Sequence, residues 1–445
     1  MRMLYESDIL DDREETPSAF NQDNWLNNLY VFEKLTDKIG ANVILLGSKS
    51  GRFTGEFDDL AYYEWDGGNL QCFHFGRKGS GKSVGAMQFA NQMNFIYGKP
   101  ILAFDRAGEY LSHNQELKDP LALRNLAAFG LKPLGFGDRH YNFSAVFLGN
   151  DDVDKWGLDL TDFFLLKPDI QAKDVIEKMV DISGDNESDM SKYDAARRYL
   201  DQALNMKPRT FEELFQYVQE INESLQQESR KSKLLEANLL KILNNGYVTP
   251  KHKINFKDKF KKGMFLNFVT SLKMSKFIPL QVYEGFLHYI INQWKKADEI
   301  PQVAVISDEH DLVASRSSEK NFLKEIYQKI ATKERKLSNI YYKITQLPDL
   351  IDEKELQQAD FMLTTKPRSA SYAEVFKWIN EDEQIRKEVM TLRWDDTPGA
   401  LKEHMMVTNN SCLRYSSFPS WSQYHKEKKQ IWLVKRPLKD TGIAF

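Results

Sequence analysis

The sequence is poor in cysteine. Only Cys72 and Cys412 occur among its 445 residues, and they lie far apart in the chain. Two separated cysteines make neither a disulfide framework nor a cysteine-rich metal site, because both need several cysteines at short spacings. This usage is typical of a reducing compartment, and it predicts a cytoplasmic protein.

Long apolar runs are also missing. The most apolar stretches, such as Phe286–Trp294, fall far short of the roughly 20 residues that a bilayer-spanning helix needs. The first residues, MRMLYESDILDDREE, are acidic and lack the basic segment and apolar core of a signal peptide. We therefore expect no membrane span and no secretion signal.

A large excess of either charge is absent as well. Lys and Arg number 61 against 64 Asp and Glu, which gives a net charge of −3 at pH 7. Such a chain has no overall positive field to attract nucleic acid, so any contact with nucleic acid must be local. Hydrophobic residues make up 42% of the sequence, which excludes wholesale disorder.

Short apolar runs typical of buried strands alternate with helix-like stretches, with no repeat of 20 to 50 residues. The predicted strands are Asn69–Phe75, Ile101–Asp105, Met264–Thr270, Gln302–Ser307, Asn339–Thr345 and Asp360–Thr365, and the predicted helices include Val84–Gly98, Gln281–Lys296 and Glu319–Lys336. This alternation predicts an α/β fold whose mostly parallel sheet is covered by helices.

One region interrupts the alternation. From about Asp151 to Asn244 the sequence is almost entirely of helical type, which predicts an inserted all-helical subdomain. The predicted organisation is an N-terminal segment of unassigned fold (1–67), the first part of the core (68–150), the helical insertion (151–257), the second part of the core (258–420) and a C-terminal tail (421–445).

The strongest motif follows the first of these predicted core strands. It satisfies G-x-x-x-x-G-K-[ST], and its residues are Gly76, Arg77, Lys78, Gly79, Ser80, Gly81, Lys82 and Ser83. The glycines let successive backbone N–H groups point at phosphate oxygens, and the start of the next helix adds partial positive charge. Lys82 is expected to reach the β- and γ-phosphates of ATP, and the Ser83 hydroxyl is expected to bind Mg²⁺. The alternative is a glycine-rich turn without a ligand.

A second motif is typical of a Walker B strand. The apolar run Val303–Ile306 leads through Ser307 to the adjacent carboxylates of Asp308 and Glu309. Asp308 is expected to orient Mg²⁺, and Glu309 to polarise the attacking water as general base. The run Asn339–Thr345 ends next to Gln346, which we expect to sense the γ-phosphate from between the two Walker strands.

Together, the segments Gly76–Ser83, Ala103–Tyr110, Val303–Glu309 and Lys333–Gln346 resemble the HerA/FtsK superfamily of P-loop motors. Within it they are similar to HerA-type translocases and to type IV secretion and conjugation ATPases. The segment AFDRAGEY discriminates best, because members of the superfamily often carry D-x-x-G-E-Y after the second strand. The resemblance implies a RecA-like P-loop NTPase core.

The resemblance also implies partners and further site residues. Members form ring hexamers whose ATP sites lie at subunit interfaces and receive an arginine from the neighbouring subunit. Arg335 and Arg368 are the candidates for that arginine, and Glu109 is expected at the same site. A homohexamer, double-stranded DNA, and partner proteins of a transfer or packaging machine are therefore the expected partners.

Three functions remain open from the sequence. The first is an ATP-hydrolysing ring motor that translocates DNA in conjugative transfer, genome packaging or DNA processing. The second is a type IV secretion-type ATPase that energises assembly or protein transfer without threading DNA. The third is an ATP-switched scaffold. The lysine-rich run Lys251–Lys262 is either a phosphate contact or an ordinary solvated surface.

Overall fold

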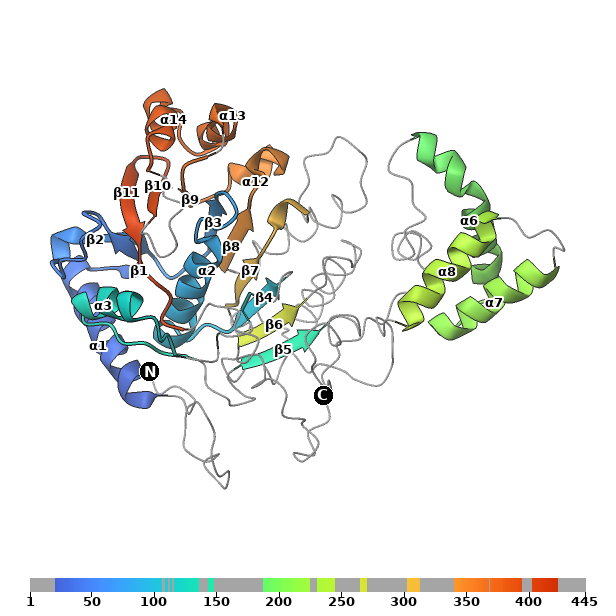
Figure 1. Cartoon of the computed structure of the whole chain (residues 1–445), viewed down its shortest axis with the longest axis horizontal. Helices are drawn as coiled ribbons and strands as arrows, with labels where there is room; N and C mark the ends of the chain where they lie inside the picture. The colour runs from blue at the N-terminus through green and yellow to red at the C-terminus, as the bar shows by residue number, and fades with distance from the viewer. Residues whose placement is uncertain are drawn as a thin grey trace, which may run out of the picture.

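In the computed structural model, the described residues are 21–105, 109–110, 113, 116–135, 143–147, 187–224, 230–244, 265–269, 302–312, 340–367, 369–393 and 402–422. Eleven strands from these residues form one sheet in the order β2-β1-β11-β10-β9-β3-β8-β7-β4-β6-β5 (Figure 1). The predicted helices Gln281–Lys296 and Glu319–Lys336 lie outside the described part of the chain.

The centre of the sheet and one of its edges are parallel. The strands from β9 to β5 in this order all pair in parallel, and they are β9 (Phe361–Thr364), β3 (Leu70–Phe75), β8 (Ile340–Thr345), β7 (Ala304–Ser307), β4 (Ile101–Asp105), β6 (Phe265–Val269) and β5 (Phe143–Phe147). Most of them are continuous apolar runs, because strands covered on both faces bury every side chain. The predicted α/β fold with a mostly parallel sheet is confirmed.

The other edge of the sheet is antiparallel. It consists of β10 (Glu403–Val407), β11 (Cys412–Ser417), β1 (Asn42–Ser48) and β2 (Leu60–Trp65). The segment between residues 22 and 65, which has no fold assigned from the sequence, thus extends the same sheet. The subdomain boundaries named above stay predictions.

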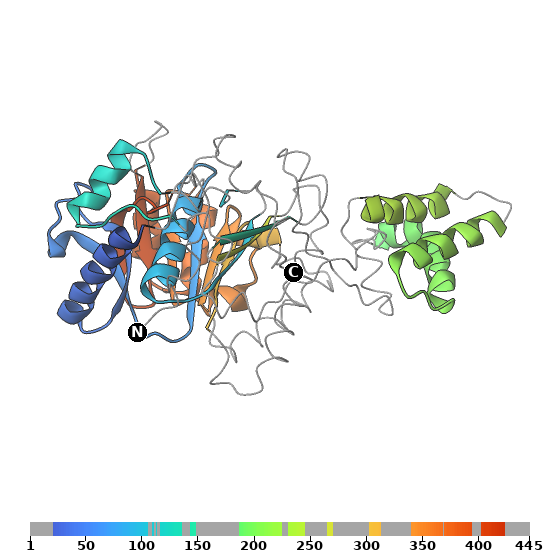
Figure 2. The ribbon, with the colours of Figure 1, turned by 90° about the horizontal axis from the view of Figure 1, so that it is seen from below.

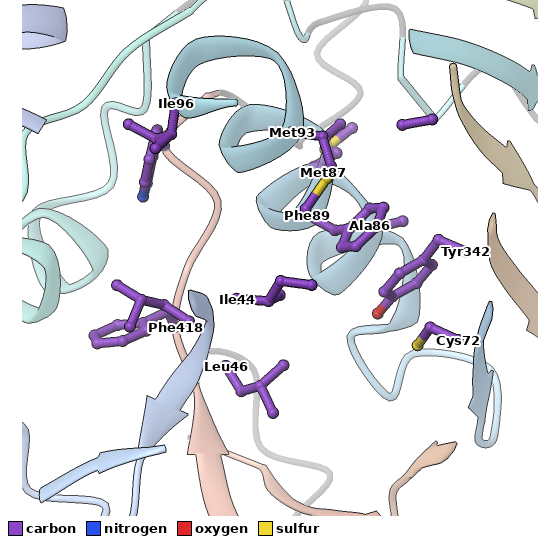
Figure 3. Close-up of a cluster of buried hydrophobic side chains, with 14 of the residues drawn as sticks. Ile44, Leu46, Cys72, Ala86, Met87, Phe89, Met93, Ile96, Tyr342 and Phe418 are labelled. Atoms are coloured by element: carbon purple, nitrogen blue, oxygen red, sulfur yellow. The ribbon is translucent and has the colours of Figure 1, made fainter. Parts of the chain in front are cut away.

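Helices cover both faces. On one face, α1 (Gln22–Ile39), α2 (Lys82–Asn91), the π-helical turn η2 (Gln92–Ile96) and α3 (Pro120–Ala128) share a core with alternate strand residues such as Cys72 and Tyr342 (Figure 3). On the other face, α12 (Glu353–Leu356), α13 (Ala370–Ala373), η6 (Glu374–Trp378) and α14 (Glu383–Met390) lie over residues such as Phe73 and Met362. Short 3₁₀ turns occupy Phe57–Asp59 (η1), His310–Leu312 (η4) and Pro348–Leu350 (η5).

Three helices form a separate group, seen together in Figure 2. They are α6 (Glu187–Asn205), α7 (Phe211–Ser224) and α8 (Arg230–Asn244), which all pack against one another. Leu200, Leu214 and Leu235 are buried between them. These helices lie within the region for which the sequence predicts helices, and an inserted subdomain with the bounds 151–257 stays a prediction. No helix in the described ranges has the length and apolarity to cross a membrane.

The attachment of β1 to β11 depends on a glycine. A Cβ atom on Gly47 would lie 1.9 Å from the backbone oxygen of Ser416 on the neighbouring strand. Gly47→Ala should therefore lower the free energy of unfolding by about 1 to 3 kcal/mol, because backbone atoms must shift to admit the methyl group. Chemical denaturation would measure the loss. Gly68→Ala is the control, since its Cβ would meet only the flexible Asp66 side chain, at 3.0 Å, and equal effects of the two would contradict the prediction.

Candidate nucleotide site

The predicted phosphate-binding loop runs from the end of β3 to the start of α2. Gly79 and Gly81 have φ values of 77° and 88°, a left-handed conformation that favours glycine. A Cβ on Gly76 would lie 2.5 Å from Ser80 Oγ and 2.6 Å from Thr365 Oγ1, so only glycine fits there without a shift. The strand, loop and helix arrangement that phosphate binding requires is present.

Lys82 is the first residue of α2, and its side chain turns back over the loop. The ammonium donates hydrogen bonds to the carbonyl oxygens of Gly76 and Arg77, both at 2.8 Å. Burial lowers the pKa of Lys82 to about 8, against the opposing pull of Asp308 and Glu109. At pH 7 the group is still mostly charged, so a buried cation lies where the phosphates are expected.

Arg77, Lys78 and Ser80 complete the loop. Arg77 Nη2 donates to the carbonyl of Pro367 at 3.0 Å, which joins the loop to the residues after β9. Ser80 is fully buried, whereas Lys78 is exposed. The expected contribution of Lys78 is therefore its backbone N–H rather than its side chain.

The two Walker B carboxylates follow β7. The backbone N–H of Asp308 donates to Phe104 O of β4 at 3.2 Å, which holds the residue at the strand end. Burial, together with the carboxylates of Glu109, Asp105 and Glu309, raises the pKa of Asp308 well above its usual range, while Lys82 lowers it. Carboxylates thus outnumber ammonium groups around Asp308.

Glu309 has an unusual backbone. Its φ is 50°, which is uncommon for a residue other than glycine and costs on the order of 1 to 3 kcal/mol. Such strain persists where the surroundings impose it, and it concentrates at functional sites. The conformation places Glu309 at the wall of a cavity of about 350 Å³, which Gly76, Arg77 and Gln346 also line.

The strand order explains why these residues meet. β8 lies between β3 and β7, so Gln346 emerges between the phosphate-binding loop and the Walker B carboxylates. All three strands are parallel and therefore end at the same edge of the sheet. The rest of the cavity wall consists of Phe75, Asp311, Leu347, Pro348, Thr364, Pro367 and Tyr372.

The segment after β4 reaches the same place. Asp105 accepts hydrogen bonds from the backbone N–H groups of Glu109 (2.8 Å) and Tyr110 (3.0 Å), and from Asn267 Nδ2 (3.1 Å). These contacts fold the chain back so that Glu109 accepts a hydrogen bond from the Ser83 hydroxyl. Glu109 therefore lies beside the residue that is expected to bind Mg²⁺.

The donor set fits Mg²⁺ bound together with a nucleotide. Mg²⁺ in proteins is usually held by one or two carboxylates, water and substrate phosphates, so it needs only the Ser83 hydroxyl and the Asp308 carboxylate here. Within the described ranges, no cluster of three or more His, Cys, Asp or Glu side chains could hold a metal by itself.

Some of the expected site residues are not placed. Arg335, Arg368 and the run Lys251–Lys262 lie outside the described residues, so the arginine from a neighbouring subunit and the lysine-rich DNA contact stay predictions.

Other contacts had no signal in the sequence. The Lys402 ammonium, just before β10, donates to the carbonyl of Gly79, and the Thr345 hydroxyl lies 2.5 Å from Asp311 Oδ1. Lys402 and Gly79 are 323 positions apart in the chain. These residues meet only because of the strand order in the sheet, and no local sequence pattern predicts that order.

No protein-family model matches the sequence, and no curated protein matches it. Among solved structures, VirB4 of Thermoanaerobacter pseudethanolicus matches at 12% identity over 84% of this chain and 96% of that chain, with a TM-score of 0.48. The plasmid coupling protein TrwB in complex with ADP and Mg²⁺ matches at 11% identity over 87% and 97%, with a TM-score of 0.46. The genome packaging NTPase B204 from Sulfolobus turreted icosahedral virus 2 matches at 11% identity over 34% and 67%, with a TM-score of 0.25.

The parallel sheet, the phosphate-binding loop after β3 and the strand between the two Walker strands make this a RecA-like P-loop NTPase core. In its motifs, the chain is similar to P-loop ATPases of the HerA/FtsK superfamily.

Proposed function

We propose that this protein binds ATP at the Gly76–Ser83 loop and hydrolyses it. The observation that carries the proposal is the shared cavity: Gly76 of the loop, the strained Glu309 and Gln346 line one space at the ends of three adjacent parallel strands. If the segment were only a glycine-rich turn without a ligand, nothing would explain why the buried Lys82, the strained Glu309 and the polar Gln346 lie at the same edge of the sheet.

Each group has a chemical task in this proposal. Backbone N–H groups of the loop and the Lys82 ammonium bind the phosphates and stabilise charge that develops on them. Glu309 accepts a proton from the attacking water, and Gln346 orients that water or a γ-phosphate oxygen. Mg²⁺, held by Ser83 and Asp308, would neutralise phosphate charge when bound with the nucleotide. Glu109 accepts the Ser83 hydroxyl proton in a hydrogen bond and so orients its oxygen.

We also propose that the energy of ATP hydrolysis drives the movement of DNA. The motif resemblance, AFDRAGEY above all, supports a homohexameric ring motor that translocates double-stranded DNA. A near-neutral chain suits such a ring, because only residues on the inner surface need to contact phosphates.

The test is the ATPase rate measured with double-stranded DNA, with single-stranded DNA and without DNA, together with sedimentation of the ATP-bound protein. Stimulation by double-stranded DNA and a hexameric species are expected. Equal turnover in the three conditions would favour an ATPase that acts on protein assembly, and ATP binding without turnover would favour a scaffold. An ATP-bound monomer at micromolar concentration would contradict the ring.

Gln346 has a measurable role in this scheme. Gln346→Ala should lower kcat about 10- to 100-fold while the nucleotide Kd changes little, because the amide acts on the transferred group or the water and not on the nucleotide as a whole. Steady-state kinetics and nucleotide titration would separate the two effects. A raised Kd with an unchanged kcat would contradict a role at the γ-phosphate.

A further inference from the structure

A lysine is buried in the middle of the central strand β8. Lys343 is only 1% exposed, although its neighbours in the strand are mainly apolar. Its ammonium donates to Glu355 Oε1 of α12 at 2.6 Å and to Gln71 Oε1 of β3 at 3.1 Å. A charge in such a place is costly unless it is paired, and here it is paired with a carboxylate that is itself 5% exposed.

The same carboxylate oxygen has a second partner. His310 Nε2 lies 2.7 Å from Glu355 Oε1, and His310 Nδ1 lies 2.9 Å from Ser307 Oγ. Burial raises the pKa of Glu355, but Lys343 and His310 outweigh burial and lower it to about 2. Glu355 is therefore ionised at neutral pH. We call Glu355, Lys343 and His310 the Glu355 network.

The network connects two segments of the proposed site. His310 directly follows Glu309, while Lys343 lies three positions before Gln346 in the sequence. A second bond joins the same segments, because Thr345 Oγ1 donates to Asp311 Oδ1 at 2.5 Å. The residues next to the expected base and next to the expected sensor are thus tied together twice.

Stability alone does not explain these groups. Replacing a buried ion pair with apolar residues of similar size is often neutral or stabilising. What an ion pair adds is a fixed geometry, since each hydrogen bond has a preferred direction and length. The strained backbone of Glu309 needs such a fixed environment.

We infer that the Glu355 network is a positioning device that holds Glu309 and Gln346 in a fixed relation across the cavity. Its members contact neither nucleotide nor water in this scheme, so they are positioning residues rather than catalytic ones. The inference rests on the proposed ATP hydrolysis and adds the residues that set the geometry of that reaction.

The experiment uses a double variant of the full-length protein, Lys343→Met with Glu355→Met, which removes both charges and retains apolar volume. We expect a melting temperature equal to or above that of the wild type, an unchanged nucleotide Kd and a kcat lowered about 10- to 100-fold. Glu355→Gln is the second variant, because it keeps the side-chain shape and an oxygen for His310. Glu381→Gln makes the same change at an exposed residue just before α14 and is the control, with wild-type kcat expected.

A second measurement separates positioning from stability. The Glu355→Gln variant is combined with Gln346→Ala, and the loss of kcat in the combination should be smaller than the product of the two separate losses, because both changes act on the placement of Gln346. Losses that multiply, or a double Met variant that melts normally and keeps wild-type kcat, would overturn the inference. A wild-type protein without ATPase activity would overturn the proposed function, and this inference with it.

Discussion

Glu309→Gln should lower kcat for ATP hydrolysis about 10²- to 10⁴-fold and leave nucleotide binding intact. The amide cannot accept the proton of the attacking water, and general base catalysis contributes about this factor. The phosphate contacts are expected from other residues, those of the loop from Gly76 to Ser83, which includes Lys82. Single-turnover kinetics and equilibrium nucleotide binding would measure the two effects separately.

The substitution suits this backbone. Gln and Glu have nearly the same shape and the same tolerance of a φ of 50°, so the change removes the carboxylate without relieving the strain. Asp349→Asn is the matched control, because it also turns a carboxylate into an amide, at an exposed position close to Leu347 and Pro348 of the cavity wall. A loss of kcat below about fivefold in Glu309→Gln, or a similar loss in Asp349→Asn, would remove Glu309 as the base.

The sequence predicts the parallel part of the sheet well, because doubly covered strands are continuous apolar runs. β4 matches its predicted bounds, and β6, β7, β8 and β9 lie within theirs. The antiparallel edge is less regular, because β1 contains the apolar run Val43–Leu46 but the other three strands mix polar and apolar residues. β11, with the sequence CLRYSS, has half-exposed and exposed residues before its buried Tyr415 and Ser416, and β5, with the sequence FSAVF, is absent from the predicted strands. Each of the two strands has a partner far away in the chain, β1 for β11 and β6 for β5.

The candidate site also contains residues that the sequence indicates and contacts that it does not. The predicted phosphate-binding loop and the Asp308–Glu309 pair each consist of consecutive residues, so a local motif is enough to predict them from the sequence. The contacts of Lys402 with Gly79 and of Lys343 with Glu355 depend on strand order and helix placement, which no local pattern encodes. A lysine inside an apolar strand, as at Lys343, was the one available signal, because a buried charge requires a partner.

The second large effect concerns Lys82. Lys82→Ala should weaken nucleotide binding by about 2 to 5 kcal/mol, which is roughly a 30-fold to several-thousand-fold rise in Kd. The reason is the loss of a buried cation opposite the phosphates, and the loop carbonyls of Gly76 and Arg77 lose their donor as well. Isothermal titration with ADP and with an ATP analogue that resists hydrolysis would measure the change.

Lys78→Ala is the comparison within the same loop. Its side chain is exposed, and the substitution retains the backbone N–H that the position is expected to contribute, so its effect on Kd should be much smaller. If the two lysine variants raised the nucleotide Kd equally, the loop would bind phosphates through its total positive charge, and the prediction of a specific role for Lys82 would be wrong.

The stability of Lys82→Ala distinguishes lost binding from lost folding. A folded-state pKa of about 8, against 10.5 for an ordinary lysine, means that the fold disfavours this ammonium by about 3 kcal/mol at pH 7, where both states are charged. As the pH rises from about 8 to 10.5, the unfolded chain holds the proton longer than the folded one, so the wild-type protein should gain stability over that range. Lys82→Ala should lack this gain and melt at or above the wild-type temperature at pH 7. A buried lysine that lowers the stability of the folded protein is expected at a binding site, because ligand binding requires its charge although folding does not.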